Sequence, residues 1–220
     1  DYRANEAYKA LRTNIQFCGD DIKVITITSC TPDEGKSSIS FNIAQSFAEI
    51  GKKVLLMDAD LRKSVLAGRY KVGVIHGGLS HYLSGQEELD RVIYETEIPG
   101  MDIIFSGTYS PNPAELLSHP RFQEMLLALR EEYDYIFIDT PPLGVVIDSA
   151  IVAQASDGAI IVIEANAISY RFVQNVKDQL DKSNCRVLGA VLNKIPMEKN
   201  GYYSKYYGKY YGDYSRKHSR

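Results

Sequence analysis

The stretch VITITSCTPDEGKSS, residues 24–38, decides the fold because it joins a β-branched apolar run to the start of a helix. The run Val24–Thr28 has the composition of a buried strand, and the residues from Ser37 to Ile50 follow a helical pattern. A strand that enters a helix through a short polar loop is the first half of a β-α-β unit. The rest of the chain is therefore expected to continue this alternation.

The alternation does continue to about residue 193. Further apolar runs predict strands at Val54–Met57, Ile103–Phe105, Tyr135–Ile138, Ala159–Ile163 and Val187–Leu192. Helical patterns lie at Arg121–Glu132, Ile147–Ala155 and Ile168–Lys182. Together these elements predict an α/β fold with a doubly wound, mostly parallel sheet. Ligands of such sheets bind beyond the carboxyl ends of the strands, so the loops that begin at residues 29, 58 and 139 are expected to carry the chemistry.

Length and composition limit the possibilities further. A chain of 220 residues suits one α/β domain, and a net charge of -3 gives no general attraction to nucleic acid. The three cysteines lack metal or redox spacing and indicate a reducing compartment. The chain begins without methionine, so we expect it to be a processed chain or part of a longer one. We expect an N-terminal helical segment (1–20), a central domain (21–196) and a polar, glycine-containing tail (197–220).

The first loop has the composition of a phosphate-binding P-loop. Gly35, Lys36 and Ser37 provide a helix N-terminus, a cation and a hydroxyl, which are the groups that a nucleotide phosphate and its Mg²⁺ require. The first glycine of the usual motif is replaced by Cys30. Alone, the segment fits a Gly-Lys-Ser turn that caps an ordinary helix better than it fits a nucleotide site. The loop residues expected to surround the phosphates are Thr31, Pro32, Asp33, Glu34, Gly35, Lys36, Ser37 and Ser38.

Acidic residues follow two other predicted strands. Asp58 and Asp60 stand at alternate positions and face the same side, with Arg62 two residues further on. Asp139 ends an apolar strand, as the acid of a Walker B motif does. Each carboxylate alone also fits a helix cap or a loop salt bridge. In combination with the Gly35–Ser37 segment, and in this order, they indicate a nucleotide site.

With these motifs the sequence resembles the bacterial tyrosine kinases, P-loop enzymes that act in capsular and exopolysaccharide synthesis. The resemblance covers nearly the whole chain and rests on the P-loop, on Asp58-x-Asp60-x-Arg62 and on Asp139-x-x-Pro142. Asn112-Pro113-Ala114-Glu115-Leu116 is similar to a further segment of the family, and Glu6-x-x-Lys9-x-x-Arg12 to its N-terminal helix motif, with Lys9 in place of an arginine.

The tail has the most unusual composition of the chain. Its pairs of tyrosines fit a helical stripe that packs on a partner, although Gly208 and Gly212 weaken such a helix. Aromatic and basic residues together also fit stacking on single-stranded nucleic acid. The resemblance implies a third role, as phosphoacceptors, for Tyr202, Tyr203, Tyr206, Tyr207, Tyr210, Tyr211 and Tyr214.

The resemblance implies transfer of the γ-phosphoryl group of ATP to a tyrosine hydroxyl. Lys36 would bridge the β- and γ-phosphates, Ser37 would bind Mg²⁺, and Asp139 would orient the metal through water. Asp58 is expected to accept the tyrosine proton, while Asp60 shares this task or supports Mg²⁺. Arg62 would hold Asp60 or the acceptor loop. Asn193 is a candidate adenine contact or, equally, part of a strand-end turn.

The resemblance also implies partners. These are a ring of subunits formed through Glu6, Lys9 and Arg12, a transmembrane activator of the polysaccharide co-polymerase type, a protein-tyrosine phosphatase and protein tyrosine substrates. The expected location is the cytoplasm, at the inner face of the plasma membrane. Two alternatives stay open at this point. A partitioning or cell-division ATPase would carry a lysine at the position of Thr31, and a non-catalytic regulator of polysaccharide export would bind nucleotide without transferring phosphate.

Overall fold

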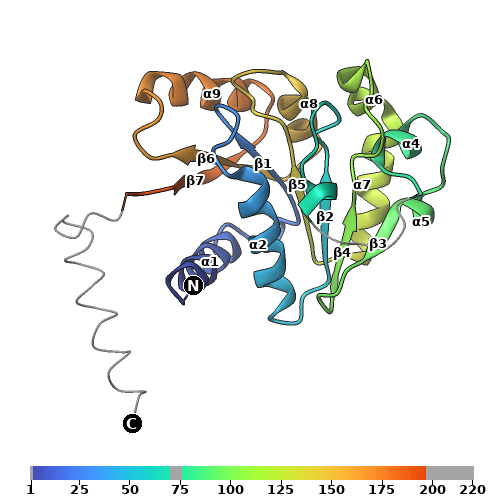
Figure 1. The fold of residues 1–220 in the computed structure, drawn as a ribbon, viewed down its shortest axis with the longest axis horizontal. Helices are drawn as coiled ribbons and strands as arrows, with labels where there is room; N and C mark the ends of the chain where they lie inside the picture. Colours follow the sequence, from blue (N-terminus) through green and yellow to red (C-terminus); the bar gives the residue numbers. More distant parts are fainter. Residues whose placement is uncertain (1, 70–75, 197–220) are drawn as a thin grey trace, which may run out of the picture.

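The structure, a computed structural model, describes residues 2–69 and 76–196 and contains a seven-stranded sheet (Figure 1). The strand order is β3-β4-β2-β5-β1-β6-β7. The strands are β1 (Val24–Ser29), β2 (Val54–Asp58), β3 (Ile93–Glu95), β4 (Met101–Ile104), β5 (Tyr135–Asp139), β6 (Gly158–Glu164) and β7 (Val187–Asn193). All neighbouring strands pair in parallel except β3, which runs antiparallel to β4 at the sheet edge. The predicted α/β fold with a mostly parallel sheet is confirmed.

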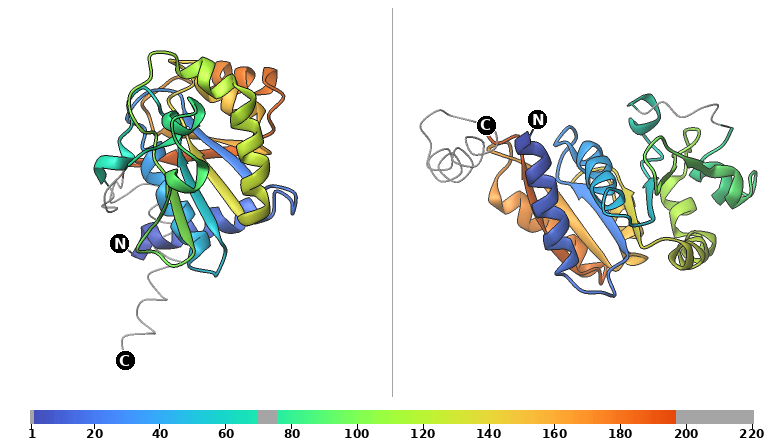
Figure 2. Two further views of the ribbon diagram at one scale, coloured as in Figure 1. Left: turned by 90° about the vertical axis from the view of Figure 1, so that its right-hand side faces the viewer. Right: turned by 90° about the horizontal axis from the view of Figure 1, so that it is seen from below.

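Helices cover both faces of the sheet, which makes it doubly wound (Figures 1 and 2). They are α1 (Tyr2–Gln16), α2 (Lys36–Ala48), α3 (Leu66–Arg69), α4 (Leu79–Leu83), α5 (Leu89–Val92), α6 (Pro113–Ser118), α7 (Pro120–Glu132), α8 (Asp148–Gln154) and α9 (Tyr170–Lys182). α1 and α2 lie side by side on one face, whereas α7, α8 and α9 cover the other.

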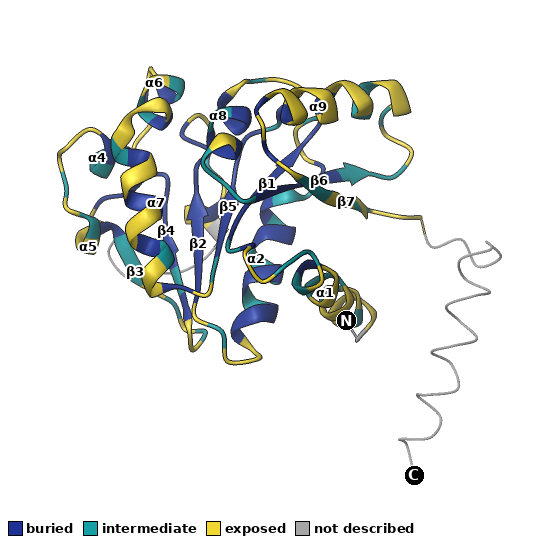
Figure 3. Ribbon diagram, turned by 180° about the vertical axis from the view of Figure 1, so that it is seen from behind, coloured by how far each residue is buried: buried dark blue, intermediate teal, exposed yellow. Residues whose placement is uncertain are grey.

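Alternate residues of each central strand belong to different halves of the core. Leu56 of β2 and Phe137 of β5 pack with α2, while Leu55 and Ile136 pack with α7. The central strands β1, β2 and β5 are almost entirely buried, and the outer sides of the helices are exposed (Figure 3). Burial on both faces explains why these strands read as continuous apolar runs.

Several short elements differ from the sequence prediction. β3 and the helices α3 to α6 have three to six residues each, too few to show a period in the sequence. In the N-terminal helix, the spacing of Ala7, Leu11 and Ile15 predicts one apolar face. This prediction was wrong at Ala7, which is exposed. Tyr8, Leu11 and Ile15 pack against the core next to α2. Within the described ranges, no helix has the length and apolarity needed to cross a membrane.

Candidate functional site

The three loops predicted to carry the chemistry begin at neighbouring strands. β5 lies between β2 and β1, so the carboxyl ends of all three strands meet at one edge of the sheet. Asp58 and Asp139 are direct partners in the register of β2 and β5, and the Ala59 N–H donates to the Asp139 carbonyl at 2.8 Å. The sheet therefore brings the second and third loops together beside the P-loop.

The P-loop turns sharply just before α2. Gly35 has φ 94° and precedes Lys36, the first residue of the helix. A Cβ atom at position 35 would lie 2.2 Å from Nδ2 of Asn193, so both the backbone and its neighbour require glycine here. Asp33 also has a left-handed backbone, with φ 64°. This succession of left-handed residues is typical of loops whose N–H groups converge on an anion.

The buried side chain of Glu34 closes the P-loop on itself. Only 1% of the residue is exposed. One of its carboxylate oxygens accepts from the Thr31 N–H at 2.7 Å, and the other accepts from the Glu164 N–H at the end of β6 at 3.1 Å. Glu34 is thus a structural member of the loop, with its carboxylate bound to backbone groups.

Cys30 occupies the glycine position of the motif without strain. Its backbone is outside the left-handed region, and its side chain is fully buried with Leu143 and Ala150. Burial, and then the nearby charge of Glu34, raise the pKa of the Cys30 thiol to about 12. The position therefore accommodates a buried apolar side chain in place of the glycine of the usual motif.

Asp139 lies under the start of α2. Ser40 donates to its Oδ1 at 3.2 Å, and Ser37 also hydrogen-bonds to this carboxylate. Burial raises the pKa of Asp139 to about 6, although Lys36 and the two serines counteract the rise. The structure therefore places the predicted Walker B acid beside the predicted phosphate and Mg²⁺ residues.

Asp58 is fully buried at the end of β2. Its carboxylate accepts from the Asp60 N–H at 3.1 Å and from the Ser64 hydroxyl. Burial and the adjacent Asp139 raise the pKa of Asp58 to about 8. A carboxylate with a raised pKa is suited to accept a proton near neutral pH.

Arg62 has a different partner from those expected. Its guanidinium donates to both carboxylate oxygens of Asp148, from Nε at 2.7 Å and from Nη2 at 3.0 Å. Asp60 instead accepts from the backbone N–H groups of Arg62 at 3.2 Å and Lys63 at 2.9 Å. The expected contact between Arg62 and Asp60 is thus made by the backbone N–H of Arg62. The Arg62 side chain is held instead by Asp148, the first residue of α8.

The oxygen donors of this site suit Mg²⁺. The Ser37 hydroxyl and the carboxylates of Asp58, Asp60 and Asp139 are hard ligands of the type that Mg²⁺ prefers. Across residues 2–69 and 76–196, no group of three or more acidic, histidine or cysteine side chains is arranged to hold a metal by itself. Mg²⁺ commonly takes one or two protein ligands and completes its shell with water and substrate phosphates. The donor set fits that mode of binding.

Asn193 ends β7 and contacts the P-loop. Its Nδ2 atom donates to the Glu34 carbonyl at 2.9 Å. The expected adenine contact of this residue stays a prediction. The tail tyrosines 202–214 lie outside the described residues.

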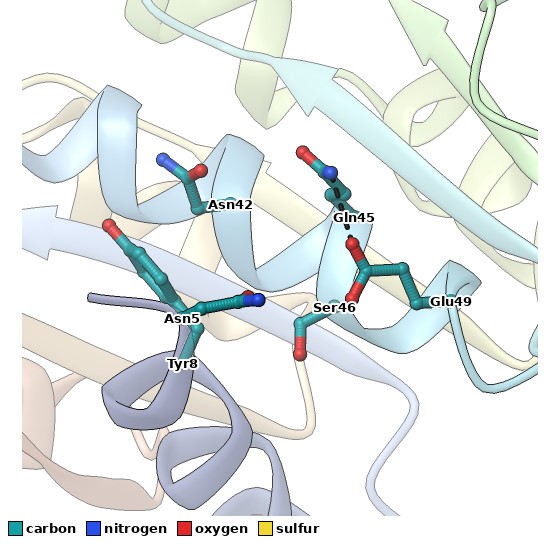
Figure 4. A pocket seen from close by; sticks show the side chains of 6 residues that line it. All are labelled: Asn5, Tyr8, Asn42, Gln45, Ser46 and Glu49. Carbon is teal, nitrogen blue, oxygen red and sulfur yellow. Dashed lines mark hydrogen bonds between the residues drawn. The ribbon is translucent and has the colours of Figure 1, made fainter. Parts of the chain in front are cut away.

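The three residues of the predicted subunit interface lie on α1. Glu6 and Lys9 form an ion pair of 2.8 Å, and Arg12 donates from Nη1 to the Ser46 hydroxyl on α2 at 2.9 Å. A small polar pocket opens beside them between the two helices (Figure 4). It is lined by Asn5 and Tyr8 from α1 and by Asn42, Gln45, Ser46 and Glu49 from α2.

Sequence reasoning missed several residues of the site. Ser40 was detectable in principle, because it lies one helical turn after Lys36. Asp148, Glu164 and Lys194 approach the loops from distant parts of the chain, and no local pattern indicates those contacts.

The fold and the site together define a P-loop nucleotide-binding protein, and a family model described as "AAA domain" matches residues 22–188. The tyrosine-protein kinase CpsD of Streptococcus agalactiae serotype III is 44% identical over 193 residues, which cover 88% of this chain and 83% of the relative. The kinase domain of the Escherichia coli tyrosine kinase ETK superposes with a TM-score of 0.85 at 34% identity and covers 90% of this chain and 79% of that domain. The chain belongs to the bacterial tyrosine-protein kinases.

One further structure shares the fold alone. The septum site-determining protein MinD of Pyrococcus horikoshii, solved with Mg-ADP, has a TM-score of 0.67 at 24% identity and covers 81% of this chain and 72% of that protein. The kinase relatives are more similar to this chain, and Thr31 replaces the lysine expected of partitioning ATPases.

Proposed function

We propose that this protein transfers the γ-phosphoryl group of ATP to tyrosine hydroxyls, first to those of its own C-terminal segment, and thereby regulates polysaccharide synthesis or export. The observation that carries the proposal is the convergence of Lys36, Asp58 and Asp139 at one sheet edge, in a member of the bacterial tyrosine-protein kinases.

The proposed roles follow from the geometry. Lys36 is at the N-terminus of α2 and beside Asp139, which supports a role for its ammonium at the phosphates. Bound Mg²⁺, held by Ser37 and the nearby carboxylates, would neutralise charge on the phosphates during transfer. Asp58 accepts the proton of the acceptor tyrosine as the new O–P bond forms and the bond to ADP breaks. Arg62, fixed by Asp148, keeps the Asp58–Asp60 loop in place through its backbone.

The acceptor is a tyrosine cluster on another subunit in this proposal. Tyr202 to Tyr214 supply seven tyrosines, and a family resemblance at the N-terminal helix supports assembly through Glu6, Lys9 and Arg12. Each phosphate adds roughly 1.5 to 2 negative charges at pH 7, so a modified tail is expected to leave the acidic site and loosen the ring. Identical elution of phosphorylated and dephosphorylated protein in size-exclusion chromatography would refute this part.

Other partners are proposed from the family alone. They are a transmembrane co-polymerase activator, a protein-tyrosine phosphatase and further tyrosine substrates, with the protein held at the inner face of the membrane by the activator. The crystal structure of the chimerical protein CapA2B2 is 31% identical to this chain, with a TM-score of 0.82.

A mixing experiment tests transfer between subunits. One chain carries Lys36→Met and an intact tail, and the other is active but has phenylalanine at the seven tail tyrosines. With ATP, Mg²⁺ and activator supplied, phosphotyrosine is expected on the tail of the Lys36→Met chain. A mixture without phosphotyrosine, although the wild type modifies itself, would show that transfer stays within one subunit.

A further inference from the structure

The ends of β6 and β7 contact the P-loop. Nζ of Lys194 donates to the Asp33 carbonyl at 2.6 Å and lies 2.9 Å from Oε2 of Glu164. Asn193 donates to the next carbonyl, that of Glu34, at 2.9 Å. Two consecutive P-loop carbonyls are therefore bound by two consecutive residues at the end of β7.

These bonds fix the direction of two N–H groups. All peptide bonds of the loop are trans, and a planar trans unit points its C=O and N–H in opposite directions. Holding the Asp33 carbonyl therefore directs the Glu34 N–H away from Lys194. Holding the Glu34 carbonyl directs the Gly35 N–H away from Asn193 in the same manner. The Gly35 N–H immediately precedes Lys36, so it lies where a phosphate is expected.

The contact also joins two strained residues. Asp33 and Lys194 both have left-handed backbones, with φ 64° and 54°. A left-handed backbone is strained for a non-glycine residue and persists where its surroundings determine it. The Lys194 side chain and the Asp33 carbonyl meet in one hydrogen bond, so one contact joins the two strained positions.

We propose that Lys194 is a positioning residue for the nucleotide: by holding the Asp33 carbonyl it keeps the P-loop N–H groups directed at the phosphates before ATP binds. Lys194 acts on the loop backbone, and its contact with Glu164 orients the ammonium. This inference rests on the proposed use of the P-loop for ATP, and it is tested by nucleotide binding without phosphoryl transfer.

The first test is the affinity for ADP with Mg²⁺, measured by calorimetry on the full chain. Lys194→Met is expected to weaken binding about tenfold, and Lys194→Arg to restore most of it because a guanidinium can still donate to the carbonyl. Lys177→Met is the matched control, since it removes an exposed lysine from the Lys177–Asp181 ion pair on α9. Binding by Lys194→Met within twofold of the wild type would overturn the proposal.

A second variant separates positioning from charge neutralisation. Glu164→Gln keeps the N–H of residue 164, which bonds Glu34, but removes the carboxylate beside Lys194. The double variant Lys194→Met/Glu164→Gln is expected to bind ADP as weakly as Lys194→Met. Recovery of wild-type affinity would show that Lys194 merely neutralises Glu164.

Hydrogen exchange in the absence of nucleotide separates positioning from a direct contact with ADP. If Lys194 orders the loop, the amides of residue 31 and residues 33–36 exchange faster in nucleotide-free Lys194→Met than in the wild type or in Lys177→Met. Unchanged exchange with weakened ADP binding would indicate a direct contact and would also overturn the proposal. A wild type that binds ADP in this way but transfers no phosphate would contradict the kinase proposal alone.

Discussion

At the scale of single residues, the fold opposes the ionisation of Asp58. Burial and the neighbouring Asp139 raise its pKa from 3.8 to about 8. The folded protein therefore holds this proton more tightly than the unfolded chain does. The destabilisation is absent below the unfolded pKa and grows as the pH rises from 3.8 to about 8.

Asp58→Asn is expected to remove this pH-dependent cost. We compare the melting temperatures of the nucleotide-free variant and the wild type. The difference, variant minus wild type, should grow by at least about 3 °C between acidic pH and pH 8, since 1 kcal/mol moves the midpoint of such a domain by roughly 2–4 °C. Thermal denaturation at a series of pH values measures this difference, with Asp90→Asn, at an exposed position, as control. A constant difference across this range would contradict the burial argument.

Cys30 illustrates a residue whose sequence signal was misleading. Its side chain is fully buried in the core between α8 and α9, and its backbone does not need glycine. Cys30→Gly, which restores the usual motif, is expected to lower stability by about 1–2 kcal/mol through lost packing and added chain entropy. Urea denaturation measures the loss. Affinity for ADP should stay within about twofold, and a markedly tighter complex would contradict this account of the position.

At the scale of elements, the first turn of α8 fixes the loop after β2. Asp148 is fully buried and receives two hydrogen bonds from Arg62. Loss of this guanidinium leaves a buried carboxylate without its partner.

Arg62→Met is therefore expected to lower the free energy of unfolding by about 2 kcal/mol. It is also expected to abolish most phosphotyrosine formation. Adding Asp148→Asn should return stability, measured by urea denaturation, because the buried charge is removed. It should not return phosphoryl transfer, because the loop still lacks its anchor. Recovery of both properties in the double variant would show that Arg62 has no role beyond compensating Asp148.

Which elements the sequence predicts depends on length and burial. β1, β2 and β5 are buried on both faces and therefore read as continuous apolar runs. β3 has three residues, and its antiparallel pairing with β4 depends on contacts that local periodicity does not record. The loops of the site were predictable because a topological rule places them at the carboxyl ends of parallel strands.

The partners of the site residues were not predictable in the same way. Arg62 and Asp148 are 86 positions apart in the chain, and Lys194 and Asp33 are 161 apart. Such contacts follow from how the strands are ordered in the sheet, which places β6 beside the P-loop strand β1 and β7 next to β6. The candidate site residues were thus predictable from local motifs, whereas the residues that hold them in place could be identified only in the folded structure.

At the scale of the whole molecule, the nucleotide loop, the acidic loops and the start of the C-terminal segment all lie at the carboxyl ends of the parallel strands. β7 ends at Asn193, directly against the P-loop, and the tyrosine cluster follows within about a dozen residues. α1 lies on the face that carries α2, so subunits that meet through α1 would lie close to the helix that begins at the P-loop.

The most direct test of the central claim is mass spectrometry of the protein after incubation with ATP and Mg²⁺, with the activator segment supplied. We predict phosphotyrosine at several of the residues Tyr202 to Tyr214 in the wild type and none in Lys36→Met. A wild-type protein that binds ATP but remains free of phosphotyrosine under these conditions would contradict the assignment as a tyrosine kinase.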